Sequence, residues 1–388
     1  KRHRFWYHTM EALTDPTNPV ARLQLWMLET RDLTRPQRDQ YIRLLRRLRE
    51  SHPDPNLRAY ATRALAGQLR THGNFEEADR LAGSLGWIGD WQFVGPLDGG
   101  SSPLEATLGP EKHLDLEGTY EGVRGETSFR PVPRLDGNGE VALDSLLSPR
   151  DGKVAYLVTW VKTDRARTVD VRFTADRPVK LFVNGESVST VEDFEGRAFD
   201  NAIVQTPLAA GWNRLMVKTV GGDSWQVGVR LTSPEGRPLG DAVTTSYSSQ
   251  KVGDIDIDTS KVETPRSPLD LRGLQPRARR LFWQGRRAAR TGPYEREEKK
   301  ARQFYEVADQ NPLALYVGFL AQPDDFPNAD DRQTLSELFE TTDTGGSGLL
   351  WRRGIHRDDA DENRAALSDF RNAIEREPTN RGAWMWLS

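Results

Sequence analysis

The sequence has no cysteine, only six histidines and no long apolar run. Without cysteine, disulfides, thiolate metal sites and thiol nucleophiles are excluded. The histidines occur in no spacing that binds a metal ion, and no stretch approaches the roughly 20 apolar residues that a membrane helix needs. The formal charge of -3 over 388 residues gives the whole chain no attraction to nucleic acid or to an anionic membrane. We therefore expect no metal site, no nucleic-acid partner and no membrane span.

Catalytic motifs are also missing. The chain contains no G-x-S-x-G elbow, no phosphate-binding loop and no dinucleotide-binding glycine motif. We therefore predict that this stretch is not itself an enzyme and carries no catalytic residues. The chain begins with Lys1 and ends with Ser388 inside a predicted helix, so we expect it to be part of a longer protein.

The two ends of the chain show helical periodicity. Over residues 1–86 and again over 275–388, apolar residues recur three and four positions apart. In the first region Leu65 and Leu69 fall on one helical face, Gly73 marks a turn, and Ala78 and Leu81 face back. This pattern predicts antiparallel helical hairpins.

The last forty residues resemble the tetratricopeptide repeat. In "ALSDFRNAIEREPTNRGAWMWLS", Ala366, Phe370, Ala373 and Pro378 have the spacing of the second repeat helix and its terminating proline, and Trp384 opens the next repeat. The resemblance implies an α-solenoid with a concave surface for a peptide or protein partner. Trp384 is a candidate contact residue for such a partner.

Between the helical ends the periodicity changes from 3.6 to 2. Stretches such as "VAYLVTWVKT", "VKLFV" and "WNRLMVKT" alternate apolar and polar residues and are separated by glycine, proline and asparagine. We predict an antiparallel β-sandwich or jelly roll over residues 87–240, followed by a linker or surface strap over 241–274. Asn184 and Gly185 accept positive φ, so we predict a two-residue type I′ turn there.

The β region resembles the carbohydrate-binding-like β-sandwich of large exported bacterial proteins. The resemblance rests on "WIGDWQFVGPLDGG", "GTYEG", "LFVNGESV", "LAAGWNRLMVKT" and "WQVGVRLTSPEGRPL". Such sandwiches sit beside tetratricopeptide repeats and sometimes upstream of a transglutaminase-like domain. The resemblance implies an accessory, non-catalytic role and a location in the bacterial envelope, the periplasm or outside the cell, with the cytoplasm as the alternative.

Two features of the β region are candidate ligand sites. Trp225 follows "GGDS" at a strand entrance, where an exposed indole with Asp223 beside it would stack on a sugar ring. The acidic stretch "VEDFEGRAFD" contains Asp193 and Asp200. Its simplest interpretation is a solvated loop; a Ca²⁺ site, the one cofactor considered, and a pair of glycosidase carboxylates are the alternatives.

A basic helix is predicted within residues 275–290. Arg286 and Arg287 are its candidate contacts for an anionic partner, and a charged repeat surface paired with nearby glutamates is the alternative.

The resulting fold class is multidomain α and β, with tetratricopeptide-like helices flanking the sandwich. The first functional hypothesis is a scaffold segment that binds protein partners through its helices and a glycan through its sandwich. The others are the accessory region of a transglutaminase- or protease-like enzyme, and a dedicated carbohydrate-binding protein.

Overall fold

The computed structural model describes most of the central β region and parts of both helical ends. The described residues are 34–133, 139–192, 199–240, 243–248, 363–376 and 381–387, with the single residues Leu13, Leu25, Val262, Leu350, Gly354, Arg357 and Asp358. The chain divides into two compact units, one of residues 1–61 and 269–388 and the other of residues 62–268. The helix α4 (Pro55–Thr71) crosses the boundary between them.

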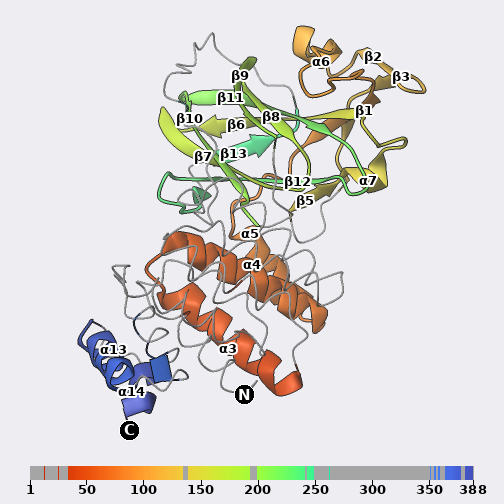
Figure 1. Ribbon diagram of the computed structural model, residues 1–388. Helices are drawn as coiled ribbons and strands as arrows, with labels where there is room; N and C mark the ends of the chain where they lie inside the picture. Colours follow the sequence, from red (N-terminus) through yellow and green to blue (C-terminus); the bar gives the residue numbers. More distant parts are fainter. Residues whose placement is uncertain are drawn as a thin grey trace. The chain divides into compact units, whose positions relative to one another are not determined.

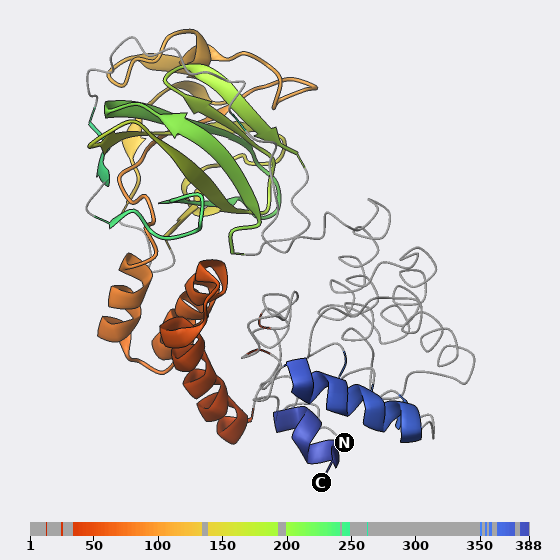
Figure 2. The same cartoon turned by 90° about the vertical axis from the view of Figure 1, so that its left-hand side faces the viewer.

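The described part of the unit of residues 62–268 is built around antiparallel sheets (Figures 1 and 2). The large sheet has the order β4 (Arg130–Pro131), β1 (Gln92–Leu97), β6 (Val154–Thr163), β11 (Gly211–Val220), β8 (Val179–Val183) and β9 (Glu186–Val191). The small sheet has the order β10 (Ala202–Leu208), β7 (Arg167–Ala175), β12 (Gln226–Thr232) and β5 (Glu140–Ala142). A separate hairpin joins β2 (Thr119–Gly122) to β3 (Gly125–Ser128).

The main hydrophobic core consists of alternate residues from both sheets. Leu157 and Val161 of β6, and Val171 and Phe173 of β7, are all fully buried in one cluster. This is the arrangement that a period of 2 predicts, since successive side chains in a strand point to opposite faces. The predicted antiparallel β domain is therefore confirmed.

The large sheet is also covered on its other face. Val154, Tyr156 and Val158 of β6 belong to a second buried cluster, which includes Phe129 from the segment between β1 and β5. That segment carries α6 (Gly109–Lys112) and the β2–β3 hairpin, which lie together at one side of the sheets (Figure 1). Burial on both faces explains why the sequence of β6 is an almost continuous apolar run.

The turn between β8 and β9 is the one predicted from Asn184-Gly185. Asn184 has φ of 54° and Gly185 has φ of 103°, and the flanking Val183 and Glu186 are paired. The Asn184 side chain also accepts a hydrogen bond from the backbone N–H of Arg214 at 2.7 Å. The pair is therefore a structural corner that is tied to the neighbouring strand β11.

The first helices follow the predicted periodicity. In α3 (Arg35–Ser51) the buried residues Tyr41, Leu44, Leu45 and Leu48 lie three and four positions apart. After α4, Gly73 turns the chain with φ of 79°. Asn74 then caps α5 (Phe75–Gly83), where its side chain accepts a hydrogen bond from the Glu77 backbone N–H at 3.4 Å.

Near the end of the chain, α13 (Asn363–Arg376) and α14 (Arg381–Leu387) share a small core. The rings of Phe370 and Trp386 are stacked, with centroids 5.7 Å apart. A Cβ atom on Gly354 would lie 2.5 Å from the Phe370 ring. A small residue is therefore required at Gly354.

The predicted α-solenoid is wrong. The described part of the chain is mostly antiparallel sheet, and its few helices form no solenoid. The helix α5 has only nine residues, and the chain after it joins the sandwich, since Ile88 N–H donates to Val229 O at 2.9 Å. Helical spacing identifies a helix, but the neighbour that its apolar face meets is decided by tertiary contacts.

The large sheet extends into the stretch that was predicted as a linker. The strand β13 (Val243–Ser246) pairs with β6 beyond the end of β1. Thr245 Oγ1 donates to the carboxylate of Asp90, and Gln92 Nε2 donates to Tyr247 O at 3.0 Å. Residues 241–242, 249–261 and 263–274 of the predicted linker lie outside the described residues.

Candidate functional site

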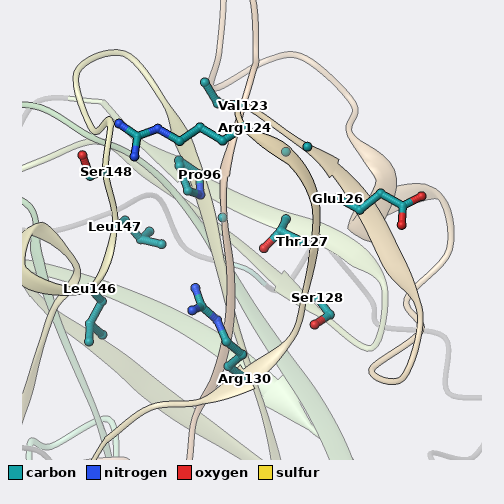
Figure 3. A pocket seen from close by; sticks show the side chains of 13 residues that line it. Pro96, Val123, Arg124, Glu126, Thr127, Ser128, Arg130, Leu146, Leu147 and Ser148 are labelled. Carbon is teal, nitrogen blue, oxygen red and sulfur yellow. The ribbon is translucent and has the colours of Figure 1, made fainter.

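A groove lies between the β2–β3 hairpin and the turn that follows α7 (Leu143–Leu146) (Figure 3). Its volume is about 510 Å³, within the range of about 300–1,000 Å³ that is usual for small-molecule sites. Gly95 and Pro96 of β1, residues 122–128, Arg130 and residues 146–148 form its walls. These segments are distant in sequence and are brought together by the strand pairing.

The hairpin holds Arg124 at its tip. Gly122 and Gly125 are paired, so Val123 and Arg124 form a two-residue turn. Val123 N–H donates to Pro96 O at 3.0 Å, which ties this turn to β1. A Cβ atom on Gly122 would lie 2.7 Å from Gly125 O, so only glycine allows this close approach.

Arg130 is positioned by the ring beneath it. It lies opposite Phe93 in the β1–β4 pair, and its Cζ atom is 4.8 Å from the centroid of the Phe93 ring. Phe93 itself is 3% exposed and belongs to the core. A guanidinium that stacks on an aromatic face keeps its N–H donors free in the plane of the group.

Both guanidinium groups reach into the groove. Figure 3 shows the Arg130 side chain pointing between Thr127 and Leu147, while Arg124 extends over Pro96 toward Ser148. Among the described residues, no hydrogen bond or ion pair joins either guanidinium to a carboxylate. Glu126 is the one acidic residue in the lining, and its side chain points away from the groove (Figure 3). The lining of the groove therefore carries two arginines and one glutamate, an excess of positive charge.

The groove was not among the sites predicted from the sequence. The signal was present in "EGVRGETSFRP", where two glycines flank Val-Arg as in a two-residue hairpin turn and a second arginine follows six positions later. The pattern gives the hairpin, but it gives no information on what the two arginines face.

Trp225 is not on the surface, so the expectation that its indole is exposed is wrong. The residue is 0% exposed and belongs to the main core. Its Nε1–H donates to Thr219 Oγ1 at 3.2 Å, and Gly221 lies against the ring, where a Cβ atom would be 2.7 Å from Cε3. The "GGDS" turn leaves Asp223 exposed while the indole faces inward.

Asp200 is not part of a solvated loop, so the interpretation predicted for the acidic stretch is wrong at this residue. Its carboxylate is 0% exposed and accepts hydrogen bonds from Arg230 Nε at 2.6 Å and Arg172 Nη1 at 3.2 Å. Arg172 Nη2 also donates to Asp170 at 2.9 Å, so two arginines and two aspartates form one buried network. Burial lowers the pKa of Arg172, and the nearby carboxylate of Asp200 partly opposes this shift.

Of the remaining predicted site residues, only Trp384 is among those that the structure describes. Asp193, Arg286 and Arg287 lie outside the described residues. Trp384 is 52% exposed on α14, so its indole is accessible on this helix. The described residues contain no group of three or more histidine or acidic side chains arranged to hold a metal ion.

A third cluster of charged groups lies beneath α6. Lys218 of β11 is fully buried and donates to Glu111 Oε1 at 2.9 Å, and the Tyr156 hydroxyl donates to the same carboxylate. Burial raises the pKa of Tyr156 and lowers the pKa of Lys218. Because Glu111 belongs to α6 and the other two groups belong to the sheet, we assign this cluster to holding α6 against the sheet.

Comparison with known proteins identifies no relative of this chain. No family model, no curated protein and no solved structure matches the chain. Within the described ranges, no helix has the length and apolar content to cross a membrane. The groove is therefore the feature from which a function can be inferred.

Proposed function

We propose that the β-sandwich is a non-catalytic binding module of a larger protein and that the groove beside the β2–β3 hairpin binds a glycan. The observation that carries this proposal is the groove of about 510 Å³ with two inward-pointing arginines. Small-molecule sites are concave and contain a few polar groups that fix the orientation of the ligand. Here the hydroxyls of Thr127, Ser128 and Ser148 supply further polar groups in the lining.

The lining supports binding rather than hydrolysis. Glycosidases use two carboxyl groups about 5–10 Å apart across the scissile bond. The groove lining has only Glu126, which points outward. The carboxylates of Asp170 and Asp200 are engaged in the buried network with arginine. The described residues thus provide no carboxylate pair at the groove.

A groove-filling substitution tests the proposal. Thr127→Trp places an indole where the Thr127 side chain points toward the groove, whereas Glu126→Trp places the same indole on the side facing away (Figure 3). We expect the unaltered chain to retain polysaccharides on a glycan array, Thr127→Trp to lose the signal and Glu126→Trp to keep it. Equal thermal melting of the three proteins controls for folding. Equal retention by both variants would contradict the assignment of the groove.

Protein-partner binding is a second candidate function, supported by the exposed Trp384. The control variant is Trp386→Ala, because the Trp386 ring is stacked on Phe370. If Trp384 contacts a partner, Trp384→Ala abolishes co-purification of that partner without lowering the melting temperature. Unchanged co-purification by Trp384→Ala would reject this role.

A further inference from the structure

The two arginines of the groove share a feature that identifies a class of ligand. Arg124 and Arg130 are both exposed and both point into one groove (Figure 3), while its one acidic residue, Glu126, points away. We infer that the groove binds an acidic glycan, whose oxyanion, a carboxylate or a sulfate ester, is held by Arg124 and Arg130. This inference rests on the proposed glycan-binding function and specifies its substrate class.

The chemistry of guanidinium favours this ligand over a neutral sugar. Arginine presents five N–H donors in a planar fork, which matches the two oxygens of a carboxylate or the oxygens of a sulfate. Two positive groups directed into one space repel each other. A bound anion attracts both groups and offsets this repulsion, whereas a neutral sugar does not.

The guanidinium of Arg130 lies over the Phe93 ring. Its stacking on Phe93, 4.8 Å from Cζ to the ring centroid, restricts the side chain, and Phe93 is itself fixed in the core. A group that is held in its binding position loses less conformational entropy when the ligand arrives. Arg130 is therefore the stronger of the two expected contacts.

The turn that carries Arg124 is held in place by a backbone hydrogen bond, whereas Arg130 is held by an aromatic ring. The hydrogen bond of 3.0 Å from Val123 N–H to Pro96 O fixes the turn against β1, and the paired glycines set its direction. In Figure 3 the Arg124 side chain extends from this turn across the groove to the Ser148 side. The two arginines thus approach the same space from the hairpin and from β4.

The test is calorimetric titration of the full chain with matched oligosaccharides. The probes are tetragalacturonate, a sulfated tetrasaccharide and an uncharged tetragalactose. The variants are Arg124→Gln and Arg130→Gln, with Arg130→Lys to keep the charge and lose the planar fork. The matched control is Arg165→Gln, which removes an exposed arginine from the turn between β6 and β7. All variants are first compared with the unaltered chain by thermal melting.

We expect at least one acidic probe to bind at least about tenfold more tightly than the neutral one, because charge-assisted hydrogen bonds are the stronger ones. Arg124→Gln and Arg130→Gln should each weaken binding of that probe about tenfold or more, and Arg130→Lys by less. Arg165→Gln should change it less than twofold. The affinity for the carboxylated and the sulfated probe identifies which oxyanion the groove prefers.

Two other outcomes separate the failure of this inference from the failure of the proposed function. Equal binding of neutral and acidic probes, unaffected by either glutamine variant, would overturn the acidic-glycan inference and leave glycan binding intact. Binding of none of the oligosaccharides would overturn both. Equal losses from Arg165→Gln and from the groove variants would mean that general surface charge, and not this groove, attracts the acidic probes, and would also overturn the inference.

Discussion

Replacing Asp200 with asparagine tests whether this carboxylate stabilises the sandwich or binds a ligand. The side chain is 0% exposed and neutralises Arg230 and Arg172, which lie directly opposite each other on β12 and β7. Asp200 has φ of 53°, a conformation that asparagine adopts as readily as aspartate. The substitution therefore removes the charge and changes the backbone preference little.

Removing one partner from a buried ion pair costs about 3–5 kcal/mol, because the other charge stays buried without compensation. For a domain of this size each kcal/mol lowers the melting temperature by about 2–4 °C. We therefore expect Asp200→Asn to lower the melting temperature by roughly 6–20 °C, measured by circular dichroism. The exposed Asp223 supplies the control, since Asp223→Asn should change stability by less than about 0.5 kcal/mol.

A double substitution separates charge from packing. In Asp200→Asn with Arg230→Met, the remaining Arg172 and Asp170 still form an ion pair at 2.9 Å, and no unpaired arginine is added. We expect the double variant to melt above Asp200→Asn alone. The reasoning is refuted if Asp200→Asn melts within about 2 °C of the unaltered chain, less than the cost of an uncompensated buried charge.

Three further predictions concern the other described features. Folding raises the pKa of Tyr156 above its ordinary value of 10.0, so the unfolded chain loses this proton first. The stability that Tyr156 contributes should fall above pH 10 by about 1.4 kcal/mol per pH unit, and urea unfolding from pH 8 to 11 should show a smaller loss for Tyr156→Phe, in which Tyr120, whose pKa burial also raises, still titrates. Gly185→Val should lower the unfolding free energy by about 1–3 kcal/mol, while Gly185→Asn, which tolerates positive φ, should lower it less; equal urea midpoints would contradict the turn assignment. Trp225→Ala should cost about 3–5 kcal/mol by leaving a cavity in the core, and an unaltered melting curve would show that the indole is not buried.

The secondary structure of the β region follows from local sequence. The ten-residue stretches of β6 and β11 are rich in apolar, β-branched and aromatic residues, a composition that favours strands. Asn184 and Gly185 accept the positive φ that joins β8 to β9. These features depend on the sterics of a few consecutive residues, so they can be read without knowing any distant contact.

The wrong predictions, a solenoid and an exposed Trp225, concern features that depend on contacts between residues distant in the sequence. Helical spacing identified α4, α5 and α13, but the solenoid prediction required each hairpin to pack on another hairpin, and residues after α5 bind β12 instead. The sequence places Trp225 at the start of a strand, but the burial of its indole depends on the close packing of Gly221 against the ring. No pattern within one segment contains that information.

The sequence by itself determined the antiparallel strands, the corner at Asn184-Gly185 and the absence of cysteine chemistry, because each depends on residue type and short-range sterics. Tertiary structure alone decided that Asp200 is a buried counter-ion, and that Arg124 and Arg130 face one groove. Strand pairing brings β1, the hairpin and the turn after α7 together, although they are separated by up to about fifty residues. Arg124 and Arg130 thereby face residues 95–96 and 146–148, because the fold, and not the sequence order, sets which groups share a space.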